Sequence, residues 1–383
     1  MSCPYKQPAH QLTMIPGPIE FSDEVLYAMS TPSQSHTSTE FVATFLSTLK
    51  QLRKIFKSTD PKAQPYVVAG SGTLGWDMAA SSLLEAGDKA LVLSTGFFSD
   101  SFAEALRVYD INVDVISAPV GDVVPLAKVA EALQKTKYQA ITITHVDTST
   151  AVVSDIKAIA AKVRELSPET LIIIDGVCSV GAEDIEFDSW GLDYVLTGSQ
   201  KALGCPAGLS ISFASARAQA KVLSRAKPAT FFASMKRWTP VMQAYEAGSG
   251  AYFATPAIQT ITALNVALKQ ILDEGLDARL AKQAQVSDKF KQDLASLGLQ
   301  IVPVSTKVAA HGLTGIYFPE GVAGGDLLAK IAGKGINVAG GIHKDIKTKY
   351  FRVGHMGVSA YRGDVGLVLQ ALKEALAELG YKK

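Results

Sequence analysis

The sequence predicts an α/β fold, in which a parallel or mixed sheet is covered by helices on both faces. Between about residues 60 and 215, short apolar runs alternate with amphipathic stretches that suit helices. Each run is apolar at successive positions rather than at every second one, so both faces of the strand are expected to be buried. The expected strands are residues 66–69, 90–93, 140–144, 171–174, 194–197 and 208–212.

The length and the later pattern indicate two domains. A chain of 383 residues, 48% hydrophobic and 19% charged, is typical of a soluble globular protein of this size. A long helical pattern follows Pro256, and beyond it helical patterns at 280–297, 327–331 and 365–379 separate strand-like runs at 300–304, 313–318, 336–339 and 351–353. We therefore predict a large domain over residues 1–265 and a smaller α+β domain over residues 266–383.

The composition excludes several classes of partner. Lys plus Arg (37) nearly equals Asp plus Glu (36), so we expect no nucleic-acid binding, and no apolar run is long enough for a membrane span. The three cysteines are too few for a disulfide framework, and the six histidines lack metal-ligand spacing, so no metal site is expected. The N-terminal residues lack the features of a signal peptide. The cytoplasm is the expected location, with a mitochondrial or peroxisomal one left open.

A glycine-rich turn follows the first expected strand and opens a helix, where residues 70–75 read GSGTLG. Backbone N–H groups at a helix N-terminus bind anions, and glycine lets a ligand approach closely. The spacing also matches the G-x-G-x-x-G of dinucleotide-binding proteins. Those proteins carry an acidic residue at the end of the next strand, where this chain reads LSTG at residues 93–96. The turn therefore favours a phosphate site over an NAD site, with a turn that binds no ligand as the alternative.

An acidic residue, Asp175, ends the apolar strand at 171–174. It is expected at the carboxyl edge of the sheet, where α/β enzymes bind ligands, and a buried carboxylate there needs a cationic or N–H partner. Taken alone, the residue is equally compatible with a ligand contact and with a simple helix N-cap.

A lysine, Lys201, lies in a loop of small residues after the strand at 194–197. Partial burial would lower its pKa below the ~10.4 of a free lysine, which suits an amine that forms a Schiff base. Taken alone, an exposed surface lysine is the commoner outcome.

These three features together predict a cofactor. Asp175 and Lys201 lie one helix-plus-strand unit apart, downstream of the glycine-rich turn. Pyridoxal phosphate needs an anion site for its phosphate, an acid that keeps its pyridine nitrogen protonated, and an amine for its aldehyde. We therefore predict pyridoxal phosphate as the cofactor and Lys201 as the residue that binds it covalently.

The sequence also resembles a known family over nearly its whole length. Residues 15–18, 70–73, 145–150, 175–179, 199–202 and 352–357 resemble the class V aminotransferases, a branch of the fold-type I enzymes that use pyridoxal phosphate. The likeness is greatest to eukaryotic, especially fungal, alanine–glyoxylate aminotransferases. It implies a large domain with a mainly parallel seven-stranded sheet between helices, and a smaller C-terminal α+β domain.

The resemblance assigns roles in cofactor binding. Lys201 would form the internal aldimine and shuttle a proton, and Asp175 would pair with the pyridine N–H. The remaining cofactor contacts would be Ser71, Gly72, Thr73 and Gln200 at the phosphate, Thr148 at the phenolic oxygen and Phe98 on the ring face. Relatives often carry Trp where this chain has Phe98, and His where it has Thr73.

The resemblance also assigns the substrate contacts and an oligomeric state. Arg352 would bind the substrate carboxylate, for which a planar guanidinium is well suited. Gly17, in an extension of the large domain, would border a small-substrate pocket. Tyr252 and Thr255, in the loop at 248–256, would reach the phosphate of a neighbouring subunit, so that a homodimer shares its active sites.

The implied function is transamination from L-alanine to glyoxylate by a ping-pong mechanism, giving pyruvate and glycine. One arginine, Arg352, and no evident second one favour small amino acids over dicarboxylates. Serine–pyruvate, serine–glyoxylate or aminoethylphosphonate transamination are alternatives. A cysteine desulfurase needs a thiol in the C-terminal half, and no cysteine follows Cys205. An NAD-binding oxidoreductase is also disfavoured, because this chain lacks the acidic residue that would bind the ribose.

Overall fold

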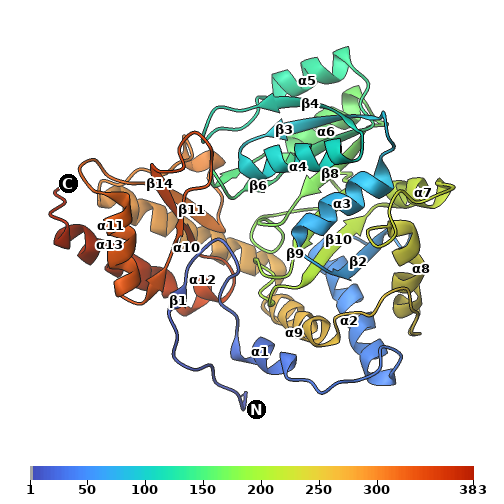
Figure 1. Cartoon of the computed structure of the whole chain (residues 1–383), viewed down its shortest axis with the longest axis horizontal. Helices are drawn as coiled ribbons and strands as arrows, with labels where there is room; N and C mark the ends of the chain where they lie inside the picture. Colours follow the sequence, from blue (N-terminus) through green and yellow to red (C-terminus); the bar gives the residue numbers. More distant parts are fainter. Residues whose placement is uncertain (1–2) are drawn as a thin grey trace.

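The computed structural model describes residues 3–383, which form a large α/β domain and a smaller C-terminal domain (Figure 1). In Figure 1 the small domain, in orange and red, lies on the left, and the large domain fills the right. The blue N-terminal segment touches the small domain at β1 (Leu12–Thr13) and then returns to the large domain at α1 (Asp23–Met29). The large domain is therefore connected to the small one twice, through the N-terminal segment and through the chain that follows α9 (Ile258–Glu274).

A seven-stranded sheet forms the centre of the large domain. Its strands are β2 (Gln64–Ala69), β3 (Lys89–Ser94), β4 (Asn112–Ser117), β5 (Ala140–Thr144), β8 (Leu171–Asp175), β9 (Tyr194–Gly198) and β10 (Leu209–Ala214). Their order is β2–β10–β9–β8–β5–β3–β4, and only β10 runs antiparallel to its neighbours. The predicted mainly parallel sheet of seven strands is confirmed.

The residues alone identified all of these strands except β4. Strands β5, β8, β9 and β10 are buried along their whole length, which explains their unbroken apolar runs. Strand β4 is the edge strand beside β3, and none of its residues is fully buried. An edge strand half exposed to water carries polar residues, and here Asn112 and Asp114 interrupt the apolar run that would have indicated a strand.

Helices flank this sheet. They are α2 (Thr39–Ile55), α3 (Gly72–Leu83), α4 (Phe97–Val108), α5 (Leu126–Lys135), α6 (Ile156–Leu166), α7 (Ala216–Ser224), α8 (Met235–Glu246) and α9 (Ile258–Glu274). Several begin at a side chain that accepts a hydrogen bond from the first turn: Ser38 caps α2, Asp155 caps α6 and Ser215 caps α7. Their apolar faces join the sheet in one continuous core.

The small domain has its own core around a three-stranded antiparallel sheet. The sheet has the order β11 (Leu313–Tyr317), β14 (Tyr350–Gly354), β13 (Ala339–Gly340). The helices are α10 (Leu276–Ser296), α11 (Gly324–Gly333), α12 (Val358–Arg362) and α13 (Asp364–Glu378), with a 3-10 turn at Thr306–Val308. Strand β12 (Ile336–Asn337) pairs in parallel with β1, so Met14 of the N-terminal segment packs into this core.

One expected strand of the small domain does not form. Of residues 300–304, only Ile301 makes an isolated bridge, to Ile316 of β11. The Val302 N–H still reaches the carbonyl of Gly315, but the Val304 N–H bonds to Gly121 of the large domain. Pro303 between them has no N–H to donate, so the segment turns away from the sheet.

The division at residue 265 stays a prediction. Helix α9 crosses that position, and its buried residues from Ile258 to Ile271 all belong to the core of the large domain. Gly275, with a φ of +88°, separates α9 from α10. We propose that the division lies at Gly275. None of the helices within residues 3–383 is long and apolar enough to cross a membrane.

Candidate active site

A cavity of about 130 Å³ lies at the carboxyl edge of the large sheet. Strand β8 ends there in Asp175, the loop after β9 adds Lys201, and the loop after β5 and the N-terminus of α3 complete the wall. The cavity brings together all the predicted cofactor contacts except Tyr252 and Thr255. They are Ser71, Gly72, Thr73, Phe98, Thr148, Asp175, Gln200 and Lys201. Their individual roles remain predictions.

Asp175 is almost fully buried, with 3% of its surface exposed. The Val177 N–H donates to its Oδ1 (3.0 Å), and the indole Nε1 of Trp76 donates to its Oδ2 (3.0 Å). The pKa of Asp175 is raised to about 6, and burial is the main cause. The two hydrogen-bond donors act in the opposite direction and limit this rise. The carboxyl group is therefore mostly ionised at neutral pH and can accept a hydrogen bond from a protonated ring nitrogen.

Lys201 meets the N-terminal segment inside the site. Its Nζ donates a hydrogen bond to the carbonyl oxygen of Pro16 (2.9 Å). The next residue, Gly17, has a φ of +134°, and a Cβ there would lie 2.6 Å from Nζ. Only glycine fits both that backbone conformation and the space beside the amine. Gly17 thus borders Lys201, and its place beside the substrate remains a prediction.

The N-terminus of α3 lines the same cavity with Gly72 and Thr73. The first N–H groups of a helix have no partner within it, and the helix dipole favours an anion there. Gly72 is the first residue of α3, and a Cβ on it would lie 2.6 Å from Cγ2 of Val177. Glycine at this position lets the helix terminus lie close to the loop that follows Asp175.

Arg352 reaches the site from β14 of the small domain. It is 8% exposed, its Nε donates to the carbonyl of Gly340 (2.9 Å), and its Nη1 donates to the carbonyl of Thr148 (3.3 Å). Two carbonyls use only part of the five guanidinium donors, so others remain for a carboxylate. Arg352 and Gly17 do not line the cavity itself, but each contacts a residue that does.

The structure does not bring Tyr252 and Thr255 into this cavity. Tyr252 is 64% exposed, and its ring packs on His36 with the centroids 5.1 Å apart. Thr255 is also exposed. Their predicted contact with the phosphate of another subunit remains a prediction.

The family model for "Aminotransferase class-V" matches residues 20–357, which include the whole cavity and Arg352. The chain belongs to the class V aminotransferases. Gly17 lies just outside the match.

Known class V aminotransferases resemble the chain over most of its length. Alanine–glyoxylate aminotransferase 1 of Saccharomyces cerevisiae is 50% identical over 358 residues, covering 91% of this chain and 92% of the yeast protein. A serine–glyoxylate aminotransferase of Arabidopsis thaliana is 28% identical and covers 91% of this chain and 86% of its own. The crystal structure of an alanine–glyoxylate aminotransferase from Nostoc sp. matches with a TM-score of 0.90 at 28% identity, covering 98% and 97% of the two chains.

The cavity of this aminotransferase also contains residues that sequence reasoning did not assign. They are Trp76, Thr144, Val146 and Val177, with Cys178 beside them. Two of these had a signal in the sequence. Trp76 lies one helical turn after Gly72 and therefore shares its face of α3, and Val177 follows Asp175 by two residues. Thr144 and Val146 were not assigned because they carry no charge, although Thr144, the last residue of β5, lies at the same carboxyl edge of the sheet as Asp175.

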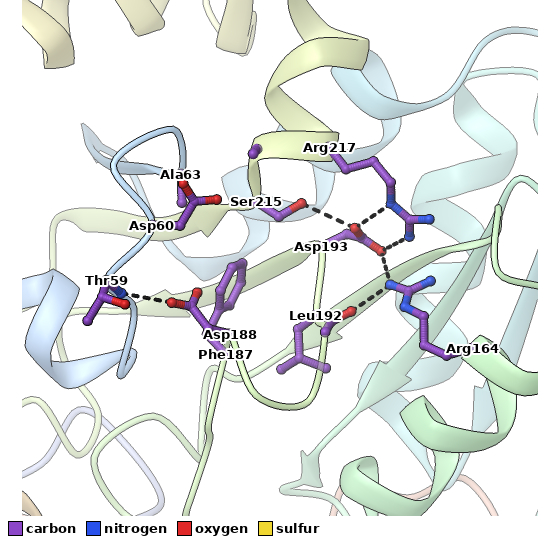
Figure 2. A pocket seen from close by; sticks show the side chains of 12 residues that line it. Thr59, Asp60, Ala63, Arg164, Phe187, Asp188, Leu192, Asp193, Ser215 and Arg217 are labelled. Atoms are coloured by element: carbon purple, nitrogen blue, oxygen red, sulfur yellow. Dashed lines mark hydrogen bonds and ion pairs between the residues drawn. The ribbon is translucent and has the colours of Figure 1, made fainter.

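Figure 2 shows a second hollow, of about 510 Å³. It lies at the amino ends of the parallel strands, because Asp193 directly precedes β9 whereas Lys201 follows it. Asp193, just before β9, lies between Arg164 and Arg217 there, with N–O distances of 2.6 and 2.5 Å. The two guanidinium groups also donate to the backbone carbonyls of residues 168, 170 and 191. These donors hold the ends of β8, β9 and α7 together, so we interpret this cluster as structural rather than ligand-binding.

Proposed function

We propose that this class V aminotransferase binds pyridoxal phosphate and transfers the amino group of L-alanine to glyoxylate, giving pyruvate and glycine. The observation that carries the proposal is the convergence of the Lys201 amine, the Asp175 carboxylate and the N-terminus of α3 on one cavity. The 50% identity to the yeast alanine–glyoxylate aminotransferase 1, over 91% of this chain, supports the choice of substrates.

Polar atoms at the cavity fit the proposed cofactor. Oε1 of Gln200 and Oγ1 of Thr144 are buried without a hydrogen-bond partner among residues 3–383. Both residues line the cavity, and a buried polar atom without a partner costs about 1–3 kcal/mol. A ligand that accepts from the Thr144 hydroxyl would remove this cost for Thr144. A phosphate only accepts hydrogen bonds, so Gln200 would hold it through the N–H donors of its amide, and Ser71, Gly72 and Thr73 would add their own donors.

The bound cofactor would supply an aldehyde for the amino group and a ring that withdraws electrons from the substrate Cα. Lys201 would carry the proton at Nζ between the substrate Cα and the carbon that receives it. Asp175 would hold the proton on the ring nitrogen. Phe98 and Val177 line the cavity and would pack against the ring, which excludes water from the reacting atoms.

The side chains around the amine favour a small substrate with one carboxylate. Arg352 would bind that carboxylate with the N–H groups that Gly340 and Thr148 leave free. The backbone of Pro16 and Gly17 lies against Lys201, so little room remains for a long side chain. L-Serine is also small and carries one carboxylate, so a serine–pyruvate or serine–glyoxylate aminotransferase is the second candidate. The 28% identity to the serine–glyoxylate enzyme gives it weaker support.

We further propose that the enzyme is a homodimer with shared active sites. The exposed positions of Tyr252 and Thr255 outside the cavity of their own chain suit a contact with the phosphate of the partner subunit. Mixing the variants Lys201→Ala and Tyr252→Ala tests this. The hybrid contains one site with Lys201 and the partner's Tyr252, so activity should recover on mixing, whereas no recovery would contradict a shared site.

A matrix of substrates tests the reaction itself. Alanine, serine and glycine would each be assayed as donor against glyoxylate and pyruvate, with kcat/KM for each pair. We expect the alanine–glyoxylate pair to be the fastest. A higher kcat/KM for serine with either acceptor would replace the proposed substrate by the second candidate.

A further inference from the structure

Trp76 is the only side chain among residues 3–383 that donates a hydrogen bond to Asp175. Its Nε1 lies 3.0 Å from Oδ2, while Oδ1 accepts from the Val177 N–H at the same distance. One donor on each oxygen fixes the plane of the carboxylate, because rotation about the Cβ–Cγ bond would break both hydrogen bonds. Val177 acts through its backbone, so Trp76 is the side chain that determines how Asp175 is held.

The indole ring is itself held firmly. Trp76 is 7% exposed, and its ring stacks on the fully buried Phe102 of α4, with centroids 5.4 Å apart and an interplanar angle of 13°. Packing on this face prevents the ring from turning away. The direction of the N–H bond is therefore set by the contact between α3 and α4 and does not depend on a ligand.

An indole N–H suits this position chemically. It only donates, and it does not change its charge at any pH at which the protein is folded. A hydrogen bond from it stabilises the ionised carboxylate relative to the neutral acid, and bonds to charged acceptors are about twice as strong as neutral ones. A histidine at this place could gain or lose a proton, so its effect on the ionisation of Asp175 would change with pH.

We propose that Trp76 is a positioning residue that keeps Asp175 ionised and oriented to hold the proton on the ring nitrogen of bound pyridoxal phosphate. The inference rests on the proposed cofactor. Helix α3 would then contribute to the site in two ways. Gly72 at its N-terminus would lie near the phosphate, and Trp76, one turn later, donates to Asp175.

Trp76→Phe tests this, since it keeps an aromatic ring against Phe102 and removes only the donor. The readout is the ¹⁵N signal of ring-labelled pyridoxal phosphate in the holoenzyme, whose chemical shift distinguishes a protonated from a neutral pyridine nitrogen. We expect a protonated nitrogen in the wild type and a shift towards the neutral form in Trp76→Phe. We also expect about a tenfold loss of kcat, with KM for alanine within about twofold, and weaker cofactor binding in equilibrium dialysis.

Trp238→Phe is the matched control. Its indole donates to the carbonyl of Phe232 (2.7 Å), away from the cavity, so this variant should keep the wild-type ¹⁵N shift. Asp175→Asn gives the shift expected when the carboxylate is lost. Should Trp76→Phe fold poorly, Trp76→Met fills the space with a flexible apolar chain and also lacks the donor.

The outcomes separate this inference from the function on which it rests. A wild type with a protonated nitrogen and an unchanged shift in the folded Trp76 variants would overturn the role of Trp76 alone. A wild type that binds no pyridoxal phosphate would overturn the proposed function and this inference together. A shift in Trp76→Phe, absent from Trp238→Phe, supports the proposal.

Discussion

Nζ of Lys201 lies 2.9 Å from the carbonyl oxygen of Pro16, a residue 185 positions earlier in the chain. The segment that makes this contact is held at both ends. The Gly354 N–H donates to the carbonyl of Met14, and the Ile19 N–H donates to that of Gln200. A short stretch of backbone thereby connects the small domain to the loop of the lysine, and Gly17 lies at its centre.

Gly17→Ala should impair catalysis more than folding. The added Cβ would lie 2.6 Å from Nζ of Lys201, so the amine would have to move from its position. We expect at least a tenfold loss of kcat, because misplaced reacting groups lose rate steeply. Gly321→Ala is the control: Gly321 also has a positive φ (+77°), but nothing lies within 4 Å of a Cβ there. A similar kcat in both variants would show that the space beside Lys201 is not limiting.

Arg352→Lys should weaken carboxylate binding. Lysine offers a point charge instead of a planar pair of donors and cannot keep the bonds to Gly340 and Thr148 in the same geometry. We expect KM to rise about tenfold or more for both the amino acid and the oxo acid, with little change in thermal stability. Arg362→Lys, at a half-exposed arginine that pairs with Asp364, provides the comparison. An unchanged KM for both substrates would remove Arg352 from the substrate site.

Which side chains meet in the cavity could be predicted from the sequence better than which segments pack around them. Asp175, Lys201 and the turn at 70–75 each follow a buried strand of a parallel sheet, and such strands end at one edge, so their meeting could be expected from order alone. The contact between Pro16 and Lys201 could not be predicted from the residues themselves. It depends on how the N-terminal segment pairs with β12, and two-residue strands such as β1 leave no periodic signal.

Two other differences have local causes. Strand β4 was missed because an edge strand is only half buried, and the expected strand at 300–304 was wrong because Pro303 interrupts it and Val304 bonds to the large domain. The role of Trp76 could not be predicted from strand ends, because this side chain reaches Asp175 from within a helix.

The stability of the apoprotein should fall on mild acidification, in part because of His355. This residue is fully buried, its Nε2 lies 2.8 Å from Oγ1 of Thr314, and burial lowers its pKa from 6.5 to about 3. Since the unfolded chain takes up this proton near pH 6.5 and the folded chain only near pH 3, the stabilisation is complete above pH 6.5 and is lost as the pH falls through this window.

His355→Gln isolates this contribution. Between pH 7 and pH 5 the free energy of unfolding, measured with urea, should fall by about 2 kcal/mol less in the variant than in the wild type. The comparison is needed because other groups act in the same range: buried His145, with a pKa lowered to about 4, adds to the loss, and Asp175, with a raised pKa, opposes it. Equal falls in both proteins would contradict a neutral buried imidazole.

Mapping the covalent attachment of the cofactor tests the central claim most directly. The protein would be incubated with pyridoxal phosphate, reduced with borohydride, digested and analysed by mass spectrometry, beside a folded Lys201→Ala variant. We predict a visible absorption band that borohydride abolishes, a cofactor adduct on the peptide of Lys201, and no turnover by the variant. An adduct on another lysine, no adduct at all, or near-wild-type turnover by Lys201→Ala would contradict the assignment of Lys201.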